Sequence, residues 1–480
     1  MNVSLLINGA DVAAIDNKTF DRLDPFTGSV ASTSPAGKVA DVNAACAAAA
    51  AAFPAWSETG PNERRKLLLK AADLLEAKTP EFIKLTMEET GATGPWSGFN
   101  VMFGAKILRE AACMTTMIHG EVIPSDKPGC FSMAIRQPAG VCVGMAPWNA
   151  PVILGVRSVA MALACGNTVV MKASETCPAT HMLIGKVLQE AGIPKGAINV
   201  VTHSREDAPQ VVEALIAHPA VRRINFTGSS HVGRIVAQIA AKYLKPVLLE
   251  LGGKAPLLVL DDANIDDAVN GAAFGAFMHM GQICMSTERI VVDNKIADAF
   301  VGKLAAKANG LPFGDPRGKV VLGSLVSEHA ANRMQELLDD AVSKGAKLVA
   351  GGKRNGTAWS ATLLDHVNPQ MKIYREESFG PVKSIIRVDG DDEAVSIAND
   401  TEYGLSSAVF SQNIQRAMAV AKRIQSGICH INGPTVNDEP QMPFGGTKDS
   451  GYGRFGGVGA IAEFTELRWV TIESHQRYPF

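Results

Sequence analysis

The chain has 480 residues, enough for about three domains of ordinary size and a large apolar core. Its 46 Lys and Arg residues nearly balance 48 Asp and Glu residues, which gives a formal net charge of −2. A chain so close to neutrality has no general electrostatic attraction for nucleic acid or for an anionic membrane. We therefore expect neither of these partners, and a small-molecule ligand instead.

The cysteines form no C-x-x-C pair and have no zinc-like spacing to histidine, so neither a disulfide framework nor a metal site is predicted. Residues 1–9 contain neither a basic start nor an apolar stretch of signal-peptide length, which predicts a cytoplasmic location. The uncharged segments 140–156 and 158–171 are interrupted by proline or asparagine. They are too short for membrane spans and are better explained as buried core.

In chain order, helical patterns come first, at 43–52 and 63–78, and from residue 140 short apolar runs alternate with longer amphipathic segments. We expect strands at 141–146, 168–171, 197–201, 221–226 and 247–250. The expected helices between them cover 151–164, 178–191, 207–217 and 230–243. This alternation predicts right-handed crossovers and a mostly parallel, doubly wound sheet.

A second series of the same kind begins at residue 256. Its expected strands are 256–260, 288–292, 346–349, 384–388, 405–410 and 427–431, and its clearest helices are 296–308 and 328–343. The predicted fold class is therefore α/β, with a second α/β domain after the first. Residues 464–472 alternate apolar and polar side chains, and they suggest a lone strand that would pair with another chain.

Polar residues cluster directly after four strands of the first series. These clusters are 147–149 (PWN), 172–175 (KASE), 227–229 (TGS) and 250–253 (ELGG). The carboxyl ends of parallel strands lie at one edge of a sheet, so clusters that are distant in sequence are expected to line one crevice.

Two glycine patterns resemble nucleotide-binding motifs but lack their context. Residues 451–456 fit G-x-G-x-x-G, yet they follow a polar segment instead of a strand, and we interpret them as a turn. Gly228 and Gly233 have P-loop spacing, but Arg234 and Ile235 replace the Lys-Ser/Thr pair that binds phosphate and magnesium. What remains is a strand, a Gly-Ser turn and a helix N-terminus, which is a suitable site for a pyrophosphate.

Several motifs, taken together and in order, resemble the aldehyde dehydrogenase superfamily over nearly the whole chain. They are FTGS (226–229) with Gly233, LELGGK (249–254), GQIC (281–284), ESFGP (377–381) and PFGG (443–446) with Lys448. The segments GQICMSTER (281–289) and EFTEL (463–467) are most similar to the aromatic-aldehyde members of the salicylaldehyde type.

The resemblance implies the division of the chain. A doubly wound NAD-binding domain would comprise 1–119 and 139–250, and a catalytic domain 251–450. A small β oligomerisation arm would comprise 120–138 and 451–480. Relatives of this type are homodimers or dimers of dimers, so we expect the same here.

By the same resemblance Cys284 is the nucleophile, which would convert the aldehyde into a thiohemiacetal that expels hydride and leaves a thioester. Asn149 would stabilise the alkoxide together with the backbone N–H of Cys284, although it could equally cap the helix that starts at Pro151. Glu250 would act as the general base for water, with a pKa raised by burial; alternatively it is a buried carboxylate hydrogen-bonded to backbone.

The resemblance assigns Lys172 and Glu175 to the adenosine ribose of the cofactor, where a carboxylate favours NAD over NADP. The alternative is a solvated pair at a helix start. Glu377 and Phe379 correspond to residues that contact the nicotinamide ribose and ring. The alternative is that they are an ordinary loop glutamate and a core phenylalanine. Further cofactor contacts are expected from Pro147, Trp148, Ser174, Gly228, Ser229 and Gly233.

Family positions around the substrate tunnel correspond to apolar side chains suited to a flat ring, which could also be ordinary core. They are Met278, Ile283, Met285 and Phe444, with Trp96 as a further wall residue. Arg157 stands where the family usually has a bulky aromatic residue. A charge is costly in an apolar tunnel, so Arg157 is expected to face either an ortho phenol oxygen of the substrate or a protein carboxylate.

These assignments predict NAD-dependent, metal-free oxidation of an aromatic aldehyde to its acid, with salicylaldehyde first and benzaldehyde, vanillin or a broader range of aldehydes as alternatives. Transfer of the acyl group to coenzyme A is a second possibility, which Glu250 argues against. A thiol esterase or a non-catalytic nucleotide-binding protein of the same fold is a third.

Overall fold

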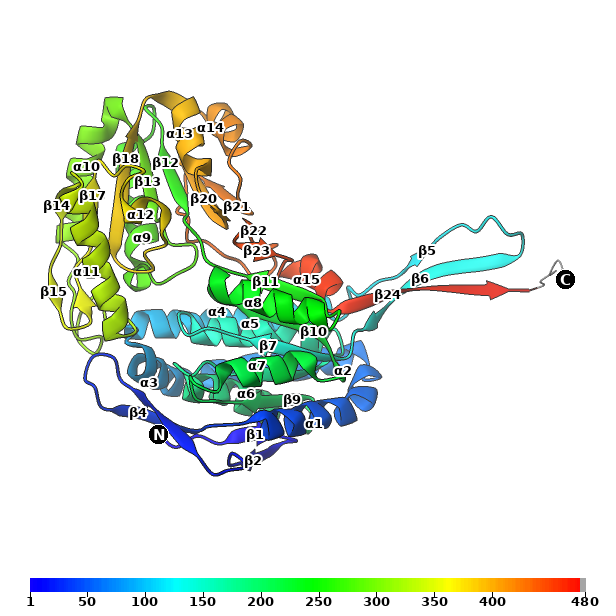
Figure 1. Ribbon diagram of the computed structural model, residues 1–480. Coiled ribbons are helices and arrows are strands. Elements are labelled where there is room, and N and C mark those ends of the chain that lie inside the picture. The colour runs from blue at the N-terminus through cyan, green and yellow to red at the C-terminus, as the bar shows by residue number, and fades with distance from the viewer. Residues whose placement is uncertain (475–480) are drawn as a thin grey trace.

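The computed structural model describes residues 1–474, and its first sheet runs in the order β2-β1-β9-β8-β7-β10-β11-β23 (Figure 1). The strands expected from the sequence form the parallel centre of this sheet: β7 (Val141–Met145), β8 (Thr168–Lys172), β9 (Ile198–Val201), β10 (Val221–Thr227) and β11 (Val247–Glu250). Antiparallel strands extend both edges: β1 (Leu5–Ile7), β2 (Ala10–Val12) and β23 (Gly451–Tyr452).

Helices cover both faces of this sheet because alternate residues of its strands are buried on opposite sides. In β7, Val141, Val143 and Met145 belong to one core cluster and Cys142 to the other. The first cluster contains residues of α1 (Val39–Ser57), α7 (Ala208–Ala217) and α8 (Ser230–Lys242). The second contains residues of α2 (Pro61–Ala77), α3 (Thr79–Thr90), α4 (Gly94–Met114), α5 (Pro151–Ala164) and α6 (Pro178–Ala191).

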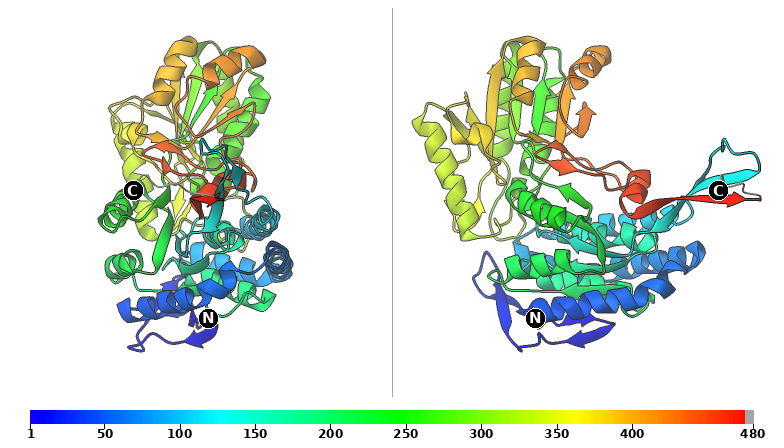
Figure 2. Two further views of the ribbon diagram at one scale, coloured as in Figure 1. Left: turned by 90° about the vertical axis from the view of Figure 1, so that its right-hand side faces the viewer. Right: turned by 45° about the vertical axis from the view of Figure 1, so that its right-hand side comes forward.

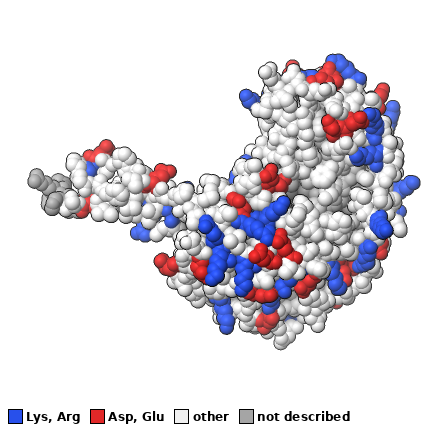
Figure 3. All heavy atoms as spheres, turned by 180° about the vertical axis from the view of Figure 1, so that it is seen from behind, with Lys and Arg blue, Asp and Glu red and all other residues white. Residues whose placement is uncertain are grey.

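By length and composition α1 could cross a membrane, but core helices pass the same test. This helix packs against β8 and β9, and it buries Val42, Ala45 and Cys46 in the core. On the face drawn in Figure 3, acidic and basic side chains are interspersed, in line with the near-zero net charge.

The second sheet runs in the order β14-β17-β18-β13-β12-β20-β21, and every pairing in it is parallel except that of β14 with β17. Its strands are β12 (Pro256–Val259), β13 (Arg289–Asp293), β14 (Lys347–Ala350), β17 (Thr362–Asp365), β18 (Val382–Val388), β20 (Ser406–Phe410) and β21 (Ile428–Ile431). The helices of this region are α9 (Ile265–Phe277), α10 (Asn294–Asn309), α11 (Glu328–Ser343), α12 (Lys372–Arg375), α13 (Gly390–Asn399) and α14 (Ile414–Ala421). The predicted second α/β unit is thus present.

A narrow sheet projects from the body, built from β5 (Glu121–Val122), β6 (Cys130–Pro138) and β24 (Thr465–Glu473) (Figures 1 and 2). The expectation that 464–472 form a lone strand is wrong, because β24 pairs antiparallel with β6 along its whole length, from Thr465 opposite Pro138 to Glu473 opposite Cys130. The other edge of β24 is the edge of the sheet, where Leu467 and Trp469 are 62% and 75% exposed. The domain boundaries stay a prediction, and residues 475–480 of the expected arm lie outside the described residues.

The interpretation of 451–456 as a turn is also partly wrong. Gly451 and Tyr452 form β23, which pairs with β11 directly beside Glu250. The strand packs so closely that a Cβ on Gly451, whose φ is +104°, would lie 2.1 Å from the carbonyl oxygen of Leu249. After it, α15 (Gly457–Glu463) packs on α4 and contacts β24.

The remaining elements are short. They are β3 (Thr19–Leu23), β4 (Val30–Pro35), β15 (Arg354–Asn355), β16 (Ala358–Trp359), β19 (Tyr403–Gly404), β22 (Thr447–Lys448) and the 3₁₀ turn η1 (Met278–Gly281). The turn η1 carries two non-glycine residues with positive φ, His279 and Met280, directly before the GQIC segment.

Candidate active site

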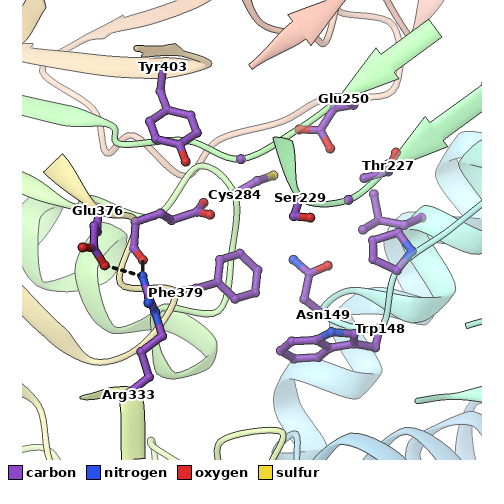
Figure 4. A pocket seen from close by; sticks show the side chains of 15 residues that line it. Trp148, Asn149, Thr227, Ser229, Glu250, Cys284, Arg333, Glu376, Phe379 and Tyr403 are labelled. Atoms are coloured by element: carbon purple, nitrogen blue, oxygen red, sulfur yellow. Dashed lines mark hydrogen bonds and ion pairs between the residues drawn. The ribbon is translucent and has the colours of Figure 1, made fainter. Parts of the chain in front are cut away.

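A cavity of about 520 Å³ lies where the ends of β7, β10 and β11 meet loops of the second α/β unit (Figure 4). The strand order places β8 and β9 on one side of β7 and β10 and β11 on the other, so the cavity adjoins the switch point of the sheet. It is lined by Pro147, Trp148, Asn149, Leu154, Thr227, Gly228, Ser229, Glu250, Gly252, Cys284, Arg333, Glu376, Glu377, Phe379 and Tyr403. Three of the four polar clusters expected at one crevice therefore contribute to one cavity.

Cys284 is held in this cavity by close backbone packing. A Cβ on Gly253 would lie 2.4 Å from the carbonyl oxygen of Cys284, and one on Gly281 would lie 2.4 Å from that of Gly380. Gly281 also has a φ of +71°, a conformation that side chains other than glycine rarely adopt. Burial raises the pKa of the Cys284 thiol well above its ordinary value, and the nearby carboxyl group of Glu250 raises it further. The resting side chain is thus a neutral thiol.

Glu250 is the last residue of β11 and is only 1% exposed. Within residues 1–474 neither of its carboxyl oxygens has a hydrogen-bond partner, so the alternative of a carboxylate bonded to backbone is wrong. Burial raises the pKa of Glu250 to about 7, while the thiol of Cys284 and the charge of Arg157 oppose the shift. Such a carboxyl group can accept and release a proton near neutral pH.

The side chain of Asn149 points into the same cavity (Figure 4). Its Nδ2 donates one hydrogen bond to the backbone carbonyl oxygen of Gln282 at 3.0 Å, and the backbone carbonyl oxygen of Asn149 accepts one from Nε1 of Trp96 at 3.1 Å. Helix α5 has no side-chain cap, so the capping alternative is wrong. An amide nitrogen carries two hydrogens, and the second is available to an oxygen bound beside Cys284.

Two aromatic rings and a half-buried glutamate line the other end of the cavity. The rings of Trp148 and Phe379 meet edge to face with centroids 5.8 Å apart. Oε1 of Glu377 accepts a hydrogen bond from the backbone N–H of Gly253 at 2.9 Å, and burial raises the pKa of this carboxyl to about 7. Nη2 of Arg333 donates to the carbonyl oxygen of Glu377 at 3.0 Å. Sequence reasoning missed Arg333, because a single arginine in an amphipathic helix carries no local signal.

Four residues expected at the cofactor do not line the cavity. Nζ of Lys172 lies 4.0 Å from Oε2 of Glu175 just after β8. Burial lowers the pKa of Lys172. Ser174 is buried, with its backbone N–H donating to Nδ1 of His181. Gly233 lets α8 pack on Leu251, whose side chain would lie 2.5 Å from an added Cβ.

The residues expected at the substrate lie outside the cavity lining as well. Met278, Ile283, Met285 and Phe444 pack in or against the core cluster that also contacts Cys284. Trp96 stacks on His279 with ring centroids 4.8 Å apart, so this side chain supports the loop before Cys284 in addition to holding Asn149.

Of the two expectations for Arg157, the structure shows the protein carboxylate. Arg157 forms a buried ion pair with Asp438, and its guanidinium lies 4.5 Å above the ring of Phe444. Asp438 and Phe444 also line a second cavity of about 320 Å³ with His430. Among the described residues, Oδ1 of Asp438 and Nε2 of His430 have no hydrogen-bond partner. Sequence reasoning missed Asp438, which lies 281 positions away from Arg157 along the chain.

Comparisons with known proteins agree with this geometry. Residues 12–470 match the model of the aldehyde dehydrogenase family. The chain is 58% identical over 479 residues to a vanillin dehydrogenase of Pseudomonas fluorescens, covering 100% of this chain and 99% of that protein. Among solved structures, a salicylaldehyde dehydrogenase from Pseudomonas putida G7 complexed with salicylaldehyde has a TM-score of 0.98 at 50% identity, with 100% of both chains covered. The structure of PnpE in complex with nicotinamide adenine dinucleotide has a TM-score of 0.95 at 38% identity, covering 100% of this chain and 99% of that one.

We expect Gly253→Ala to displace the backbone of Cys284 and to lower the free energy of unfolding by about 1–3 kcal/mol, as overpacking does. The matched control is Gly302→Ala in α10, where an added Cβ would meet nothing within 4 Å. That change replaces glycine by a better helix former and is expected to be neutral or stabilising. Urea unfolding measures the free energy of unfolding of each variant. Equal values for Gly253→Ala and Gly302→Ala would contradict the packing argument.

Proposed function

Because the chain belongs to the aldehyde dehydrogenase family, we propose that it oxidises an aromatic aldehyde, such as salicylaldehyde or vanillin, to the carboxylic acid with NAD. The observation that carries this proposal is the meeting of Cys284, Asn149 and Glu250 at one cavity. The identity with proteins named for vanillin and salicylaldehyde, over essentially the full chain, supports the aromatic substrate class.

In the first step, the sulfur of Cys284 bonds to the aldehyde carbon and its proton leaves. Since the pKa of the thiol is raised, the proton needs an acceptor nearby, and Glu250 with a pKa of about 7 is placed to be one. The aldehyde oxygen becomes an alkoxide, to which the second Nδ2 hydrogen of Asn149 donates. A fixed donor of this kind stabilises the developing charge by about 3–4 kcal/mol.

The residues of the cavity suit a dinucleotide. Gly228 and Ser229 precede the N-terminus of α8, where Ser229 caps the backbone N–H of Val232 and a pyrophosphate would find further N–H groups. Phe379 and Trp148 would flank a flat ring, and Glu377 would accept hydrogen bonds from ribose hydroxyls. When bound, NAD supplies the acceptor for the hydride that leaves the carbon attached to Cys284.

The thioester that remains on Cys284 is released by water. Once the proton taken from the thiol has passed to solvent, Glu250 in its ionised form would take a proton from that water as the oxygen attacks the acyl carbon. Because burial raises its pKa to about 7, this carboxylate is a stronger base than an exposed glutamate.

The proposed preference for NAD over NADP rests on Glu175. Burial opposes ionisation of this carboxyl, but the charge of Lys172 leaves its pKa below the ordinary value, so the group is anionic. An anion at the adenosine ribose repels a 2′-phosphate.

The Arg157 and Asp438 pair supports a substrate ring that carries a hydroxyl. Both groups lie close enough to Glu250 to influence its pKa, so they are near the reacting centre. The unpaired Oδ1 of Asp438 and Nε2 of His430 in the second cavity are suitable partners for a ring substituent that donates or accepts a hydrogen bond.

We also propose a homodimer or dimer of dimers in the cytoplasm. The exposed Leu467 and Trp469 on the edge strand β24 suit pairing with a second copy of the chain. All cysteines of the chain fall within the described residues and are free, which agrees with a reducing compartment.

The direct test mixes the protein with NAD and an aldehyde panel and follows the absorbance of the reduced nicotinamide. We expect turnover with salicylaldehyde, vanillin and benzaldehyde, and weaker turnover with short aliphatic aldehydes. Silence across the whole panel would defeat the proposal.

Aldehyde oxidation should rise with pH through about 7, because Glu250 is a base only when ionised and its raised pKa keeps it protonated below that value. Glu250→Gln should remove this dependence and lower turnover by about 10²–10⁴-fold. The control is Glu402→Gln, an exposed acid outside the cavity lining, which should keep the wild-type profile. A pH–rate profile that is the same in wild type and Glu250→Gln would contradict the role of the base.

Asn149→Asp keeps the shape of the side chain but removes the donor, and we expect it to lower kcat by about 10²–10³-fold. The affinity for NAD should change little. Steady-state kinetics at varied NAD concentration separate the effect on kcat from the effect on NAD affinity. An unchanged kcat would show that groups other than Asn149 stabilise the alkoxide.

Arg157→Met removes the charge that pairs with Asp438. We expect kcat/KM for salicylaldehyde and vanillin to fall by about tenfold or more, because a charge-assisted contact is lost. Benzaldehyde, which has no ring hydroxyl, should be affected much less. Parallel kinetics on the three aldehydes test this, and an equal loss on all of them would assign Arg157 a purely structural role.

A further inference from the structure

A buried ion cluster lies behind the loop that carries Glu377 and Phe379. Its members are Lys254, Glu288 and Lys383, whose side chains are 0%, 2% and 0% exposed. Nζ of Lys254 donates to Oε2 of Glu288 at 2.8 Å, and Nζ of Lys383 donates to Oε1 at 2.7 Å. The three residues come from the adjacent strands β12, β13 and β18 or from the positions just before them, so the sheet itself brings them together.

The same carboxylate holds the 376–380 loop through its backbone. The N–H groups of Ser378 and Phe379 donate to Glu288 at 2.9 and 3.3 Å, and the hydroxyl of Ser378 donates at 2.7 Å. Nζ of Lys254 also donates to the carbonyl oxygen of Glu376 at 2.7 Å. One buried cluster thus contacts three of the four residues 376–379, in a loop that has no regular secondary structure.

The held conformation is a strained one. Phe379 has a φ of 48°, which L-residues adopt only when their surroundings impose it. Its ring meets Trp148 across the cavity, while the neighbouring Glu377 lies against Gly253. The hydrogen bonds to Glu288 hold the backbone N–H groups of Ser378 and Phe379 in this conformation.

The charges of the two lysines keep Glu288 ionised although it is buried. Burial opposes ionisation of Glu288, but the two ammonium groups lower its pKa to about 2, so the carboxylate is permanently charged. Two buried cations face this single anion. All three charges reach Glu377: Glu288 adds to the effect of burial and raises the pKa of that carboxyl, whereas the two lysines lower it. The cluster therefore acts on the position and on the charge of the carboxyl group that lines the cavity.

We propose that Glu288 is a positioning residue for the cofactor: paired with Lys254 and Lys383, it fixes the 376–380 loop so that Glu377 and Phe379 face the nicotinamide end of the cavity. This inference rests on the proposed function, since it assigns that end of the cavity to NAD. The reacting residues Cys284, Asn149 and Glu250 lie outside the 376–380 loop, so chemistry at the thiol that needs no cofactor should not require Glu288.

The test compares Glu288→Gln with wild type in two assays and by melting temperature. We expect the dissociation constant for NAD, measured by calorimetry, to rise by about tenfold or more because the loop is misplaced. Hydrolysis of p-nitrophenyl acetate by the Cys284 thiol without NAD should be largely kept. Loss of both together in a folded protein would contradict the proposal.

A second variant guards against failure to fold, because a glutamine leaves two buried lysines without an anion. In Lys254→Met/Glu288→Leu/Lys383→Met the whole cluster becomes apolar, a replacement that is often neutral or stabilising. It still removes the acceptor for Ser378 and Phe379, so NAD binding should stay weak although the protein is stable. Wild-type NAD affinity in this variant would overturn the proposal.

The matched control is Arg289→Met at the next position of the chain. Arg289 is fully buried and donates to the carbonyl oxygens of Ile397, Ala398 and Asp400, away from the 376–380 loop. We expect a lower melting temperature with unchanged NAD affinity. If Arg289→Met weakened NAD binding as much as Glu288→Gln, general destabilisation would explain both. Wild-type protein that binds NAD but oxidises no aldehyde would refute the proposed function separately.

Discussion

The site depends on the burial of a thiol beside a carboxyl group that has no hydrogen-bond partner in the described chain. Burial raises the pKa of both groups; the Glu250 carboxyl raises the pKa of the Cys284 thiol further, whereas the thiol lowers the pKa of Glu250. An uncompensated polar group of this kind costs about 1–3 kcal/mol of stability, so it persists only where the surrounding structure holds it. The consequence is a neutral thiol beside a carboxyl group that accepts and releases a proton near neutral pH.

Both α/β units contribute to holding these residues in place. Glu250 and Asn149 lie at the ends of β11 and β7 in the first sheet, whereas Cys284 precedes β13 of the second. Glycines let the backbones touch: Gly253 against Cys284, and Gly281 against Gly380. The Lys254, Glu288 and Lys383 cluster then holds the loop on the far side of the cavity. Close backbone contacts therefore fix the geometry at the sulfur, and the buried charges fix the loop at the other end of the cavity.

Much of this could be predicted from the sequence, since it rests on local patterns. The parallel strands β7 to β11 and the helices between them follow from apolar periodicity, and the polar ends of those strands predict one crevice. Pairings between distant segments do not follow from local patterns: β24 with β6, Arg157 with Asp438, and Glu288 with two lysines. Glu288 illustrates the reason, because a charged residue before a strand is usually solvent-exposed, and only the sheet order places Lys254 and Lys383 beside it.

The most direct measurement of the central claim is mass spectrometry of the wild-type protein quenched in acid during turnover. With NAD and an aromatic aldehyde present, the peptide that contains Cys284 should gain the mass of the acyl group, and without NAD it should not. Turnover with an unmodified Cys284, or with the acyl group on another of the cysteines, would contradict the account.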